Sequence, residues 1–231
     1  MKLGIMQPYF FPYIGYWQLI NAVDIFVIYD NIQYKKKGWF NRNRYLLNGK
    51  DTLFSINLKN DSDFLNVNER FLSPEYKRAK LIAMFQNAYS KAPMKKEVIP
   101  FLSEVINCQE ENLFKYIYNS VVKICEYLEV KTKIVISTSI DIDHSLKAEN
   151  KVLAICEKLN AKTYINPTGG LELYSKDKFM EQGIELKFIK SNLIEYKQFD
   201  NEFLPWLSIL DVMMFNDRDN IKHFLKEYEL V

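Results

Sequence analysis

A short N-terminal loop brings together side chains that could bind a phosphorylated ligand. It runs from Gln7 to Tyr16 and reads QPYFFPYIGY. Gly15 stands at a loop-to-helix junction, where a glycine lets the backbone approach a ligand and point its amides at an anion. Tyrosine hydroxyls can donate to phosphate or accept from a sugar. The residues predicted to contact substrate are Gln7, Pro8, Tyr9 and Gly15, with Tyr13 and Tyr16 ordering the substrate for catalysis. For the aromatic Phe10, Phe11 and Trp17, packing of the helix onto a sheet is an equally good interpretation.

A second polar segment, YDNIQYKKKGWFNRNRY, extends from residue 29 to residue 45. Asp30 ends an apolar run, a position where a carboxylate can act as a base or bind an amine. Five cations follow within ten residues, enough for a diphosphate, although a lysine run is usually a solvated face. An arginine beside Trp39 can bind phosphate bidentately while the indole stacks on a base. Asp30 is the predicted catalytic base, and the predicted ligand contacts are Gln33, Tyr34, Lys37, Trp39, Asn41 and Arg42.

Two later segments could also bind phosphate. Ser137, Thr138 and Ser139 follow a strand-like run and offer hydroxyls and backbone amides, although a polar strand end explains them equally well. Gly169 and Gly170 could form an anion nest or a plain tight turn. His144 has no partner at a spacing typical of a metal site, which favours a surface histidine and predicts no metal.

The elements that must position these residues begin with a β–α–β unit. KLGIM, residues 2–6, reads as a strand, a helix is expected from Ile14, and IFVIYD, residues 25–30, reads as a second strand. So short a crossover implies parallel strands with a right-handed connection. Because ligands bind beyond the carboxyl ends of such strands, the loops 7–15 and 30–44 should lie close together.

The rest of the chain predicts further alternation. Residues 39–58 suggest a hairpin turning at Asn48-Gly49, and 73–128 three helices, with Ser73 as a cap and Pro74 in the first turn. Further strands and helices follow over 131–189, and two helices end the chain, the last over 219–230. We predict an α/β fold: a Rossmann-like, three-layer parallel sheet with a helical insertion. One domain would span 1–231, with an α/β core over 1–60 and 130–190, a helical subdomain over about 73–128 and C-terminal helices over 200–231.

The N-terminal layout resembles the HxGH nucleotidylyltransferase and pantothenate-synthetase superfamily, in which a strand leads to PxHxGH at a helix start. The corresponding letters here are PYIGY, residues 12–16, so tyrosine replaces both histidines. ISTSI, residues 136–140, resembles the ISTxxx phosphate loop of that superfamily. This resemblance implies a related fold and ATP-dependent chemistry, but a neutral tyrosine can only hydrogen-bond a transferred phosphate.

A resemblance to the WbqC-like family covers nearly the whole chain. The motifs that carry it are MQPYFFPYIGYWQLI, YDNIQYKKKGWFNRNRY, ISTSID, NPTGG with Tyr174, and PWLSILD. A Ser-Gly-Pro-Gly-like loop common in that family is replaced here by Asn166-Pro167-Thr168-Gly169-Gly170. The resemblance implies a role in bacterial O-antigen biosynthesis, around nucleotide-linked and often amino-bearing sugars, and adds Tyr174 to the predicted contacts.

Composition sets limits on partners and compartment. The 231 residues carry a formal net charge of +2, which gives no general sign of a nucleic-acid partner and disfavours RNA. Three cysteines, of which Cys125 and Cys156 fall in apolar helical patterns, favour reduced thiols in the cytoplasm. We find no signal-peptide pattern and no apolar run long enough to cross a membrane.

Three functions remain open from the sequence. The first is a transferase acting on a nucleotide-linked amino sugar, most concretely an N-acyl or aminoacyl transferase, with Asp30 taking the amine proton. The second is ATP-dependent nucleotidyl or adenylyl transfer, for which a nucleoside triphosphate would be the cofactor. The third is a non-catalytic sugar-nucleotide-binding or scaffold module. Self-association into a homo-oligomer stays open as well.

Overall fold

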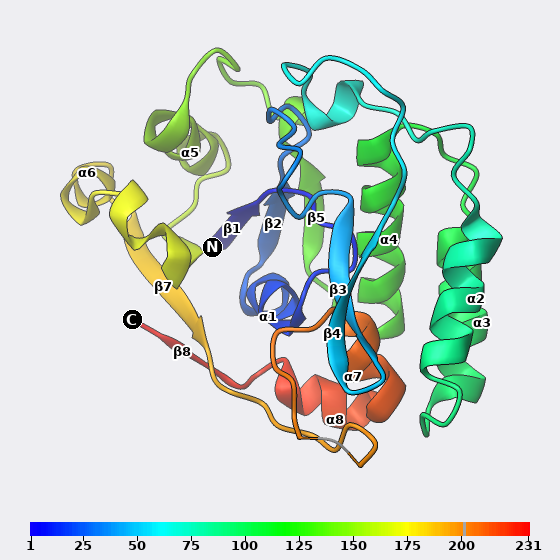
Figure 1. Cartoon of the computed structure of the whole chain (residues 1–231). Coiled ribbons are helices and arrows are strands. Elements are labelled where there is room, and N and C mark those ends of the chain that lie inside the picture. The colour runs from blue at the N-terminus through cyan, green and yellow to red at the C-terminus, as the bar shows by residue number, and fades with distance from the viewer. Residues whose placement is uncertain (201) are drawn as a thin grey trace.

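The chain folds around a mostly parallel six-stranded sheet (Figure 1). The computed structural model describes residues 1–200 and 202–231; residue 201, in the predicted C-terminal helical segment, lies outside the described residues. The strand order is β5-β2-β1-β6-β7-β8. The strands are β1 (Lys2–Met6), β2 (Ile25–Ile28), β5 (Lys133–Ile136), β6 (Thr163–Pro167), β7 (Glu185–Ser191) and β8 (Tyr228–Leu230).

The order in which the chain adds strands to the sheet reverses at β1. From β1 the chain adds β2 and then β5 on one side, and afterwards adds β6 and β7 on the other, all in parallel. Among the strands of this sheet that the structure describes, only β8 is antiparallel, paired with β7. The order of the five parallel strands is that of a doubly wound, Rossmann-like sheet, whose ligands bind where the order reverses. The predicted mixed α/β class is therefore confirmed, and the reversal lies between β1 and β6.

Side chains that alternate along the strands divide between two cores. Leu3, Ile5 and Val27 join the core under α5 and α6, whereas Phe26 and Ile28 join the larger core shared with α1 and α4. This alternation is expected for strands buried on both faces. The helices that cover the two faces are α1 (Ile14–Ala22), α4 (Leu113–Tyr127), α5 (Ala148–Lys158) and α6 (Lys176–Glu181).

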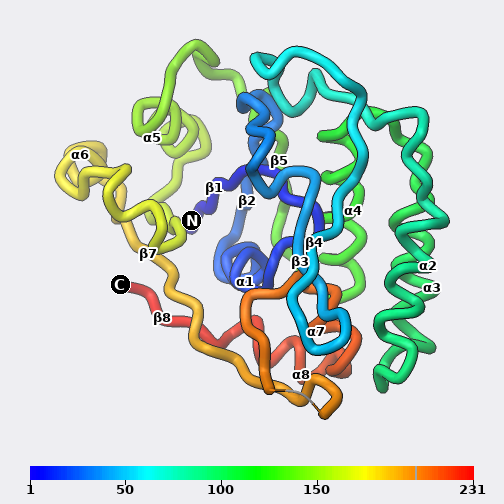
Figure 2. Tube along the Cα trace, viewed as in Figure 1, coloured from blue at the N-terminus to red at the C-terminus, as the bar shows by residue number. Residues whose placement is uncertain are grey.

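A hairpin and a helical pair extend the larger core. Strands β3 (Arg42–Leu47) and β4 (Lys50–Ser55) pair antiparallel around Asn48 and Gly49, both with positive φ, as the Asn-Gly signal predicts. Helices α2 (Arg78–Ala88) and α3 (Lys95–Ile106) lie side by side at the outer edge of the molecule, beyond α4 (Figure 2). The predicted hairpin and the three helices between residues 73 and 128 are thus present.

Two boundary predictions are wrong. Ser73 does not cap α2; its carbonyl and hydroxyl accept the amides of Tyr76 and Glu75, closing a separate turn before the helix begins at Arg78. The last predicted helix also stops early, because α8 (Arg218–Phe224) ends before the chain pairs with β7 as β8. An unpaired edge of β7 offers ladder hydrogen bonds that local helical periodicity does not reveal.

Helix α7 (Ile209–Phe215) is fixed by a buried carboxylate. Asp211 accepts hydrogen bonds from the hydroxyls of Tyr89 (2.8 Å) and Tyr196 (2.7 Å) and from Nε2 of Gln198 (2.7 Å). Burial raises the pKa of Asp211, and the three hydrogen bonds oppose that rise. The carboxylate therefore ties α7 to the end of α2 and to the segment after β7.

The cysteines that the sequence places in apolar helices are buried. Burial raises the pKa of Cys125 and of Cys156 to about 12, so both thiols stay protonated at neutral pH. Both therefore act as apolar core residues. Within the described residues, no helix has the length and apolar character needed to cross a membrane.

Candidate functional site

The loop after β1 packs against the segment after β2, as the shared sheet edge predicts. The amide of Phe10 donates to the carbonyl of Phe40 at 3.2 Å, and the rings of Tyr9 and Phe40 meet edge to face. Asn43 of β3 donates to the carbonyls of Phe10 and Phe11, at 3.2 and 2.8 Å. Two segments more than twenty residues apart thus form one continuous wall.

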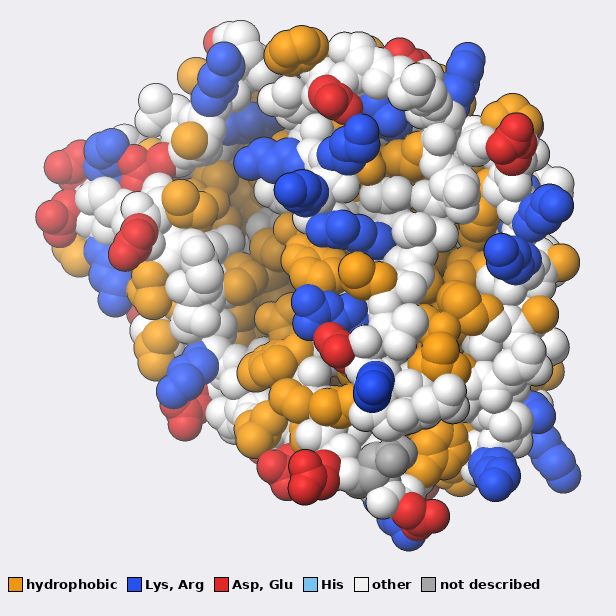
Figure 3. Space-filling model, viewed as in Figure 1, with side chains coloured by type: hydrophobic (Ala, Val, Ile, Leu, Met, Phe, Trp, Pro, Cys, Tyr) orange, Lys and Arg blue, Asp and Glu red, His pale blue; other side chains and the backbone are white. Residues whose placement is uncertain are grey.

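Beside this wall the surface is hollowed (Figure 3). The lobe with α5, α6 and η3 (Thr168–Leu173) lies on one side, and the hairpin with the loop after β2 on the other (Figures 1 and 3). Lys and Arg side chains gather on the hairpin side, and hydrophobic side chains line much of the interior. The hollow lies over the strands where the sheet order reverses, which is where doubly wound sheets bind ligands.

Asp30 lies just beyond β2 and is only 4% exposed. Its Oδ1 accepts hydrogen bonds from Ser137 Oγ (2.7 Å) and from the amide of Thr138 (3.0 Å). Its Oδ2 accepts from Thr138 Oγ1 (2.6 Å) and from Asn68 Nδ2 (3.2 Å). A carboxylate has about four acceptor sites, so these donors use its capacity and join the ends of β2 and β5.

The serine-threonine segment that follows β5 forms the short helix η2 (Ser137–Ser139). Ser137 and Thr138 direct their hydroxyls to Asp30, and Ser139 donates to the carbonyl of Ile136 at 2.7 Å. Hydroxyls and an amide that could hold a phosphate are thus engaged by a carboxylate of the same chain. Ser137 is buried, whereas Thr138 and Ser139 are exposed.

In the N-terminal loop, Tyr16 is buried and its hydroxyl donates to the carbonyl of Gln7 at 3.0 Å. Burial raises the pKa of Tyr16 well above its ordinary value. Tyr9 donates to the side-chain carbonyl of Gln7, also at 3.0 Å. Pro8 is buried, whereas Gln7 and Tyr9 are only partly covered. The two tyrosines therefore fix the position of Gln7 at the end of β1.

Gly15, the first-turn residue of α1, gives room to a neighbouring ring rather than to open space. A Cβ at this position would lie 2.5 Å from Cε2 of Tyr13 and 2.6 Å from Oγ of Ser191. Tyr13 is half-buried, and both its ring and Ser191, the last residue of β7, lie against Gly15. Gly15 therefore allows the backbone of α1 to pack closely against Tyr13 and the end of β7.

The basic rim of the hollow consists of three lysines and two arginines. Arg42 donates through Nε to the carbonyl of Gly38 at 3.0 Å and through a terminal nitrogen to that of Lys37. Both Arg42 and Arg44 place their guanidinium carbon 5.6 Å from the ring of Trp39, which is 38% exposed. The exposed lysines beside them are Lys35, Lys36 and Lys37.

The remaining predicted contacts after β2 have internal partners. The hydroxyl of Tyr34 donates to Asn41 at 2.9 Å, and Asn41 donates to the carbonyl of Ile56 at 2.8 Å. Arg70 lies over the ring of Tyr34 at 4.7 Å, and the exposed Gln33 donates to the carbonyl of Asp63 at 3.1 Å. These contacts therefore fix the segment that carries the basic rim.

The two glycines after β6 differ sharply. A Cβ on Gly170 would lie 1.9 Å from Nδ2 of Asn166, whereas a Cβ on Gly169 would meet nothing within 4 Å. Asn166 is buried and accepts a hydrogen bond from Tyr164 at 3.1 Å. Tyr174 packs its ring edge-on against Tyr164, and burial raises its pKa. The position of the Asn166 side chain therefore requires a glycine at residue 170.

Comparison with known proteins identifies the family of the chain. The model of the WbqC-like protein family matches residues 7–223. The chain belongs to the WbqC-like family. It is also similar to Rv1507c, an uncharacterized protein of Mycobacterium tuberculosis, with 27% identity over 219 residues and 93% coverage of each chain. No solved structure matches it.

In this WbqC-like chain the sequence interpretation missed a buried lysine. Lys151 of α5 is 8% exposed, donates to Oδ1 of Asn31 at 3.0 Å and lies 5.2 Å from the ring centroid of Tyr29. A signal was present, because Lys151 precedes the apolar Ile155 by four residues and so falls on the buried face of the helix. Lys151 therefore joins the candidate site at the end of β2.

His144 is also closer to the site than a surface histidine would be. It is half-buried, Nδ2 of Asn31 lies 3.2 Å from its Nδ1, and its Nε2 lies 3.0 Å from the carbonyl of Ile140. A neutral ring with its proton on Nε2 satisfies both contacts. The ring is thus only partly exposed, and it contacts the side-chain amide nitrogen of Asn31, whose oxygen accepts from Lys151.

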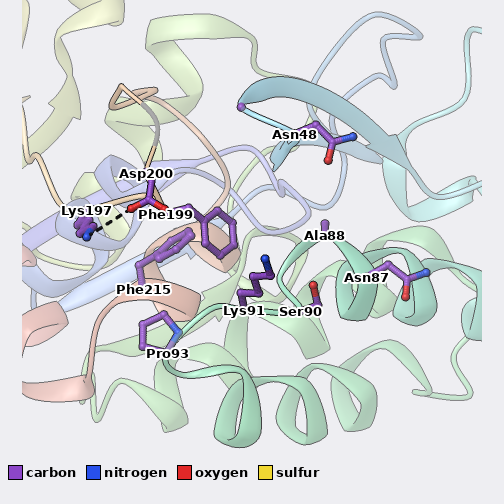
Figure 4. Close-up of a pocket in the computed structure, with 11 residues that line it drawn as sticks. Asn48, Asn87, Ala88, Ser90, Lys91, Pro93, Lys197, Phe199, Asp200 and Phe215 are labelled. Carbon is purple, nitrogen blue, oxygen red and sulfur yellow. Dashed lines mark ion pairs between the residues drawn. The ribbon is translucent and has the colours of Figure 1, made fainter.

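A separate cavity of about 680 Å³ lies near the hairpin turn (Figure 4). Its charged side chains include Lys197 and Asp200, whose ion pair spans 3.7 Å and whose side chains are 83% and 100% exposed. Phe199 and Phe215 contribute apolar surface. No buried charge is directed into this cavity among its described lining residues, so the strand-end hollow is the better candidate site.

Proposed function

We propose that this WbqC-like protein is a transferase that acts on a nucleotide-linked amino sugar in bacterial surface-polysaccharide synthesis. The most concrete form of the reaction is N-acyl or aminoacyl transfer. The sugar amine would attack the carbonyl of an activated donor, form an amide and release the donor's leaving group and a proton.

The observation that carries the proposal is the hollow at the reversal of the sheet order, bordered by the basic rim. A nucleoside-diphosphate sugar combines an aromatic base, two negative phosphates and a polar ring. Trp39 supplies an exposed aromatic surface, and Lys36, Lys37 and Arg42 supply positive charge beside it. Cations around an aromatic face suit a base joined to a diphosphate.

Within this proposal Asp30 is better assigned to positioning than to proton transfer. Its carboxylate already accepts hydrogen bonds from Ser137, Thr138 and Asn68, so a proton would have to displace one of them. Its role as the catalytic base stays a prediction from the sequence. The proposed transfer does not depend on that role, because the substrate would be held chiefly by the rim and the hollow.

The alternative of ATP-dependent nucleotidyl transfer gains less support. It would use Tyr13 and Tyr16 in place of two histidines and the Ser137–Ser139 loop as a phosphate site. Tyr16 is buried against the carbonyl of Gln7, and the loop already binds Asp30. Tyr16 and the hydroxyls of Ser137 and Thr138 are therefore already engaged by groups of the same chain.

The test begins with ligands retained by the purified protein, identified by mass spectrometry, and continues with a thermal-shift panel of nucleoside-diphosphate sugars. A ligand that binds only the folded state raises the unfolding temperature by mass action. Sugars that shift the wild type would then be incubated with acyl thioesters and aminoacyl adenylates, and the products weighed. Gain of the acyl mass on the sugar supports the transferase; binding without any product under all donors would favour a binding module.

A matched pair of lysine variants locates the binding surface. Lys36→Gln changes the basic rim, whereas Lys50→Gln changes another exposed lysine, at the turn of the β3–β4 hairpin. We expect a smaller thermal shift in Lys36→Gln and an unchanged shift in Lys50→Gln. Equal shifts in the two variants would place the ligand elsewhere.

A further inference from the structure

Lys151 is a buried ammonium with few partners. It projects from the sheet-facing side of α5 and is 8% exposed. Of its three N–H donors, one reaches Oδ1 of Asn31 at 3.0 Å, and the group lies 5.2 Å from the ring centroid of Tyr29. Within the described part of the chain, no carboxylate oxygen lies within 4.0 Å of its nitrogen.

A buried charge in this state has lost hydration that its surroundings only partly replace. An amide oxygen and an aromatic face stabilise an ammonium less than a direct anion does. Burial accordingly lowers the pKa of Lys151, and the charge of nearby Asp30 opposes that decrease. Two N–H donors stay available for an acceptor that the described residues do not supply.

Asp30 cannot become that acceptor without losing its present partners. Its four hydrogen bonds come from two hydroxyls, one amide N–H and one side-chain amide, and none comes from Lys151. Asn31 Oδ1 accepts from Lys151 at 3.0 Å and lies 3.0 Å from Ser137 Oγ, whose one proton is donated to Asp30, so Asn31 stands between the two charges. The carboxylate of Asp30 is thus fully hydrogen-bonded inside the protein, whereas the ammonium of Lys151 has one hydrogen bond and an aromatic face.

We propose that Lys151 is an anion anchor that binds a phosphate oxygen of the nucleotide-linked substrate. This inference rests on the proposed function and assigns the floor contact of the same site. Phosphate oxygens stay ionised across the neutral range and accept several hydrogen bonds, which suits the two free donors. The basic rim would attract the diphosphate from solution, and Lys151 would fix one of its oxygens at the end of β2.

A purely structural role makes different predictions. If Lys151 only balanced the charge of Asp30, its loss would destabilise the fold and leave the affinity of the folded protein for phosphate unchanged. If it anchors phosphate, its loss weakens binding and leaves the fold intact. Lys147 supplies a matched control, because it is an exposed lysine at the start of the same helix.

The experiment is isothermal titration calorimetry of inorganic pyrophosphate into the full-length wild type and into Lys151→Met, Lys151→Arg and Lys147→Met. We expect Lys151→Met to weaken pyrophosphate binding by at least about tenfold, as loss of a direct charged contact does. Lys151→Arg, which keeps the charge, should stay within about threefold, and Lys147→Met should match the wild type. Circular dichroism checks that each variant is folded. If Lys151→Met does not fold, the affinity of Lys151→Arg for pyrophosphate still tests the proposal.

Two results would overturn the anchor. One is equal pyrophosphate affinity in folded Lys151→Met and wild type, and the other is absence of pyrophosphate binding by the wild type. The same titrations with nucleoside-diphosphate sugars separate this inference from the function. If such a sugar binds wild type and Lys151→Met equally, the anchor fails and the proposed function stands; if pyrophosphate binding depends on Lys151 but no nucleotide sugar binds, the proposed function fails.

Discussion

Two buried charges at one edge of the sheet differ in how completely the protein satisfies their hydrogen bonds. Asp30, at the end of β2, accepts four hydrogen bonds that come from η2 and from Asn68. Lys151, on the helix that follows η2, has one amide acceptor and an aromatic face. The first charge is fully satisfied inside the protein, and the second is not.

This difference shows that location at the carboxyl ends of the strands does not by itself make a residue part of a binding site. Asp30 and the hydroxyls around it satisfy each other, so their combined effect is to hold β2 against β5. Lys151 keeps unused donors, so its environment is completed only by something added. Unused hydrogen-bonding capacity, rather than location alone, separates the two.

Loss of the Asp30 carboxylate should have the largest effect on stability. Asp30→Ala leaves four donors at the β2–β5 junction without their acceptor, which should lower the free energy of unfolding by about 3 kcal/mol or more. Urea denaturation measures this loss. The control is Asp141→Ala, an exposed carboxylate paired with Lys158, which should cost less than about 1 kcal/mol. Similar losses in the two variants would contradict the structural role of Asp30.

The two glycines after β6 give the next largest contrast. Gly170→Ala places a Cβ 1.9 Å from the side-chain nitrogen of Asn166 and should cost about 1–3 kcal/mol through displacement of the asparagine. Gly169→Ala meets open space and should change the free energy of unfolding by less than about 0.5 kcal/mol. Thermal unfolding of both variants checks the pair. Equal stabilities would show that Asn166 moves aside freely.

Asp211 extends the comparison to a buried carboxylate away from the sheet edge. Because burial raises its pKa in the folded state, the stability that it contributes is complete below its unfolded pKa and decreases as pH rises through the folded pKa. The free energy of unfolding of the wild type, minus that of Asp211→Asn, should therefore fall between pH 4 and pH 7. Urea denaturation at both pH values measures the change, and a difference that grows with pH would refute it.

Removal of the Lys151 charge should have the smallest effect on stability. Lys151→Met replaces an incompletely solvated ammonium with an apolar chain of similar length, so stability should stay within about 1 kcal/mol of the wild type or rise. Differential scanning calorimetry measures this. A loss above about 2 kcal/mol would mean that the ammonium is as well satisfied in the fold as Asp30, and the contrast between the two charges would disappear.

The sequence predicted the framework of the site because that framework is local. Apolar runs before Gln7 and at residues 25–28 marked two strands, and their short crossover forced them parallel, so the loops after them had to meet. The Asn48-Gly49 signal likewise placed the hairpin. Each of these features depends on a few adjacent residues.

Partners that come from distant parts of the chain could not be predicted in the same way. Asp30 was recognised as a polar strand end, but its contact with Thr138 spans 108 residues. Gly15 was predicted to let the backbone approach a ligand closely, yet the groups that lie close to it include Ser191 of β7. Lys151 was visible only as a charge on an apolar helix face. Which hydrogen bonds are already used is a property of the folded chain, and it changes the role assigned to each residue.

The central claim is that the hollow beside the basic rim binds a nucleotide-linked sugar. The most direct test is calorimetric titration of UDP-, dTDP-, GDP- and CDP-linked sugars into wild type, Trp39→Ala and Lys50→Gln. The account predicts that at least one of them binds wild type and Lys50→Gln equally, and Trp39→Ala at least about tenfold more weakly, because a base has lost its stacking surface. Absence of binding across the panel, or equal affinity in Trp39→Ala, would contradict it.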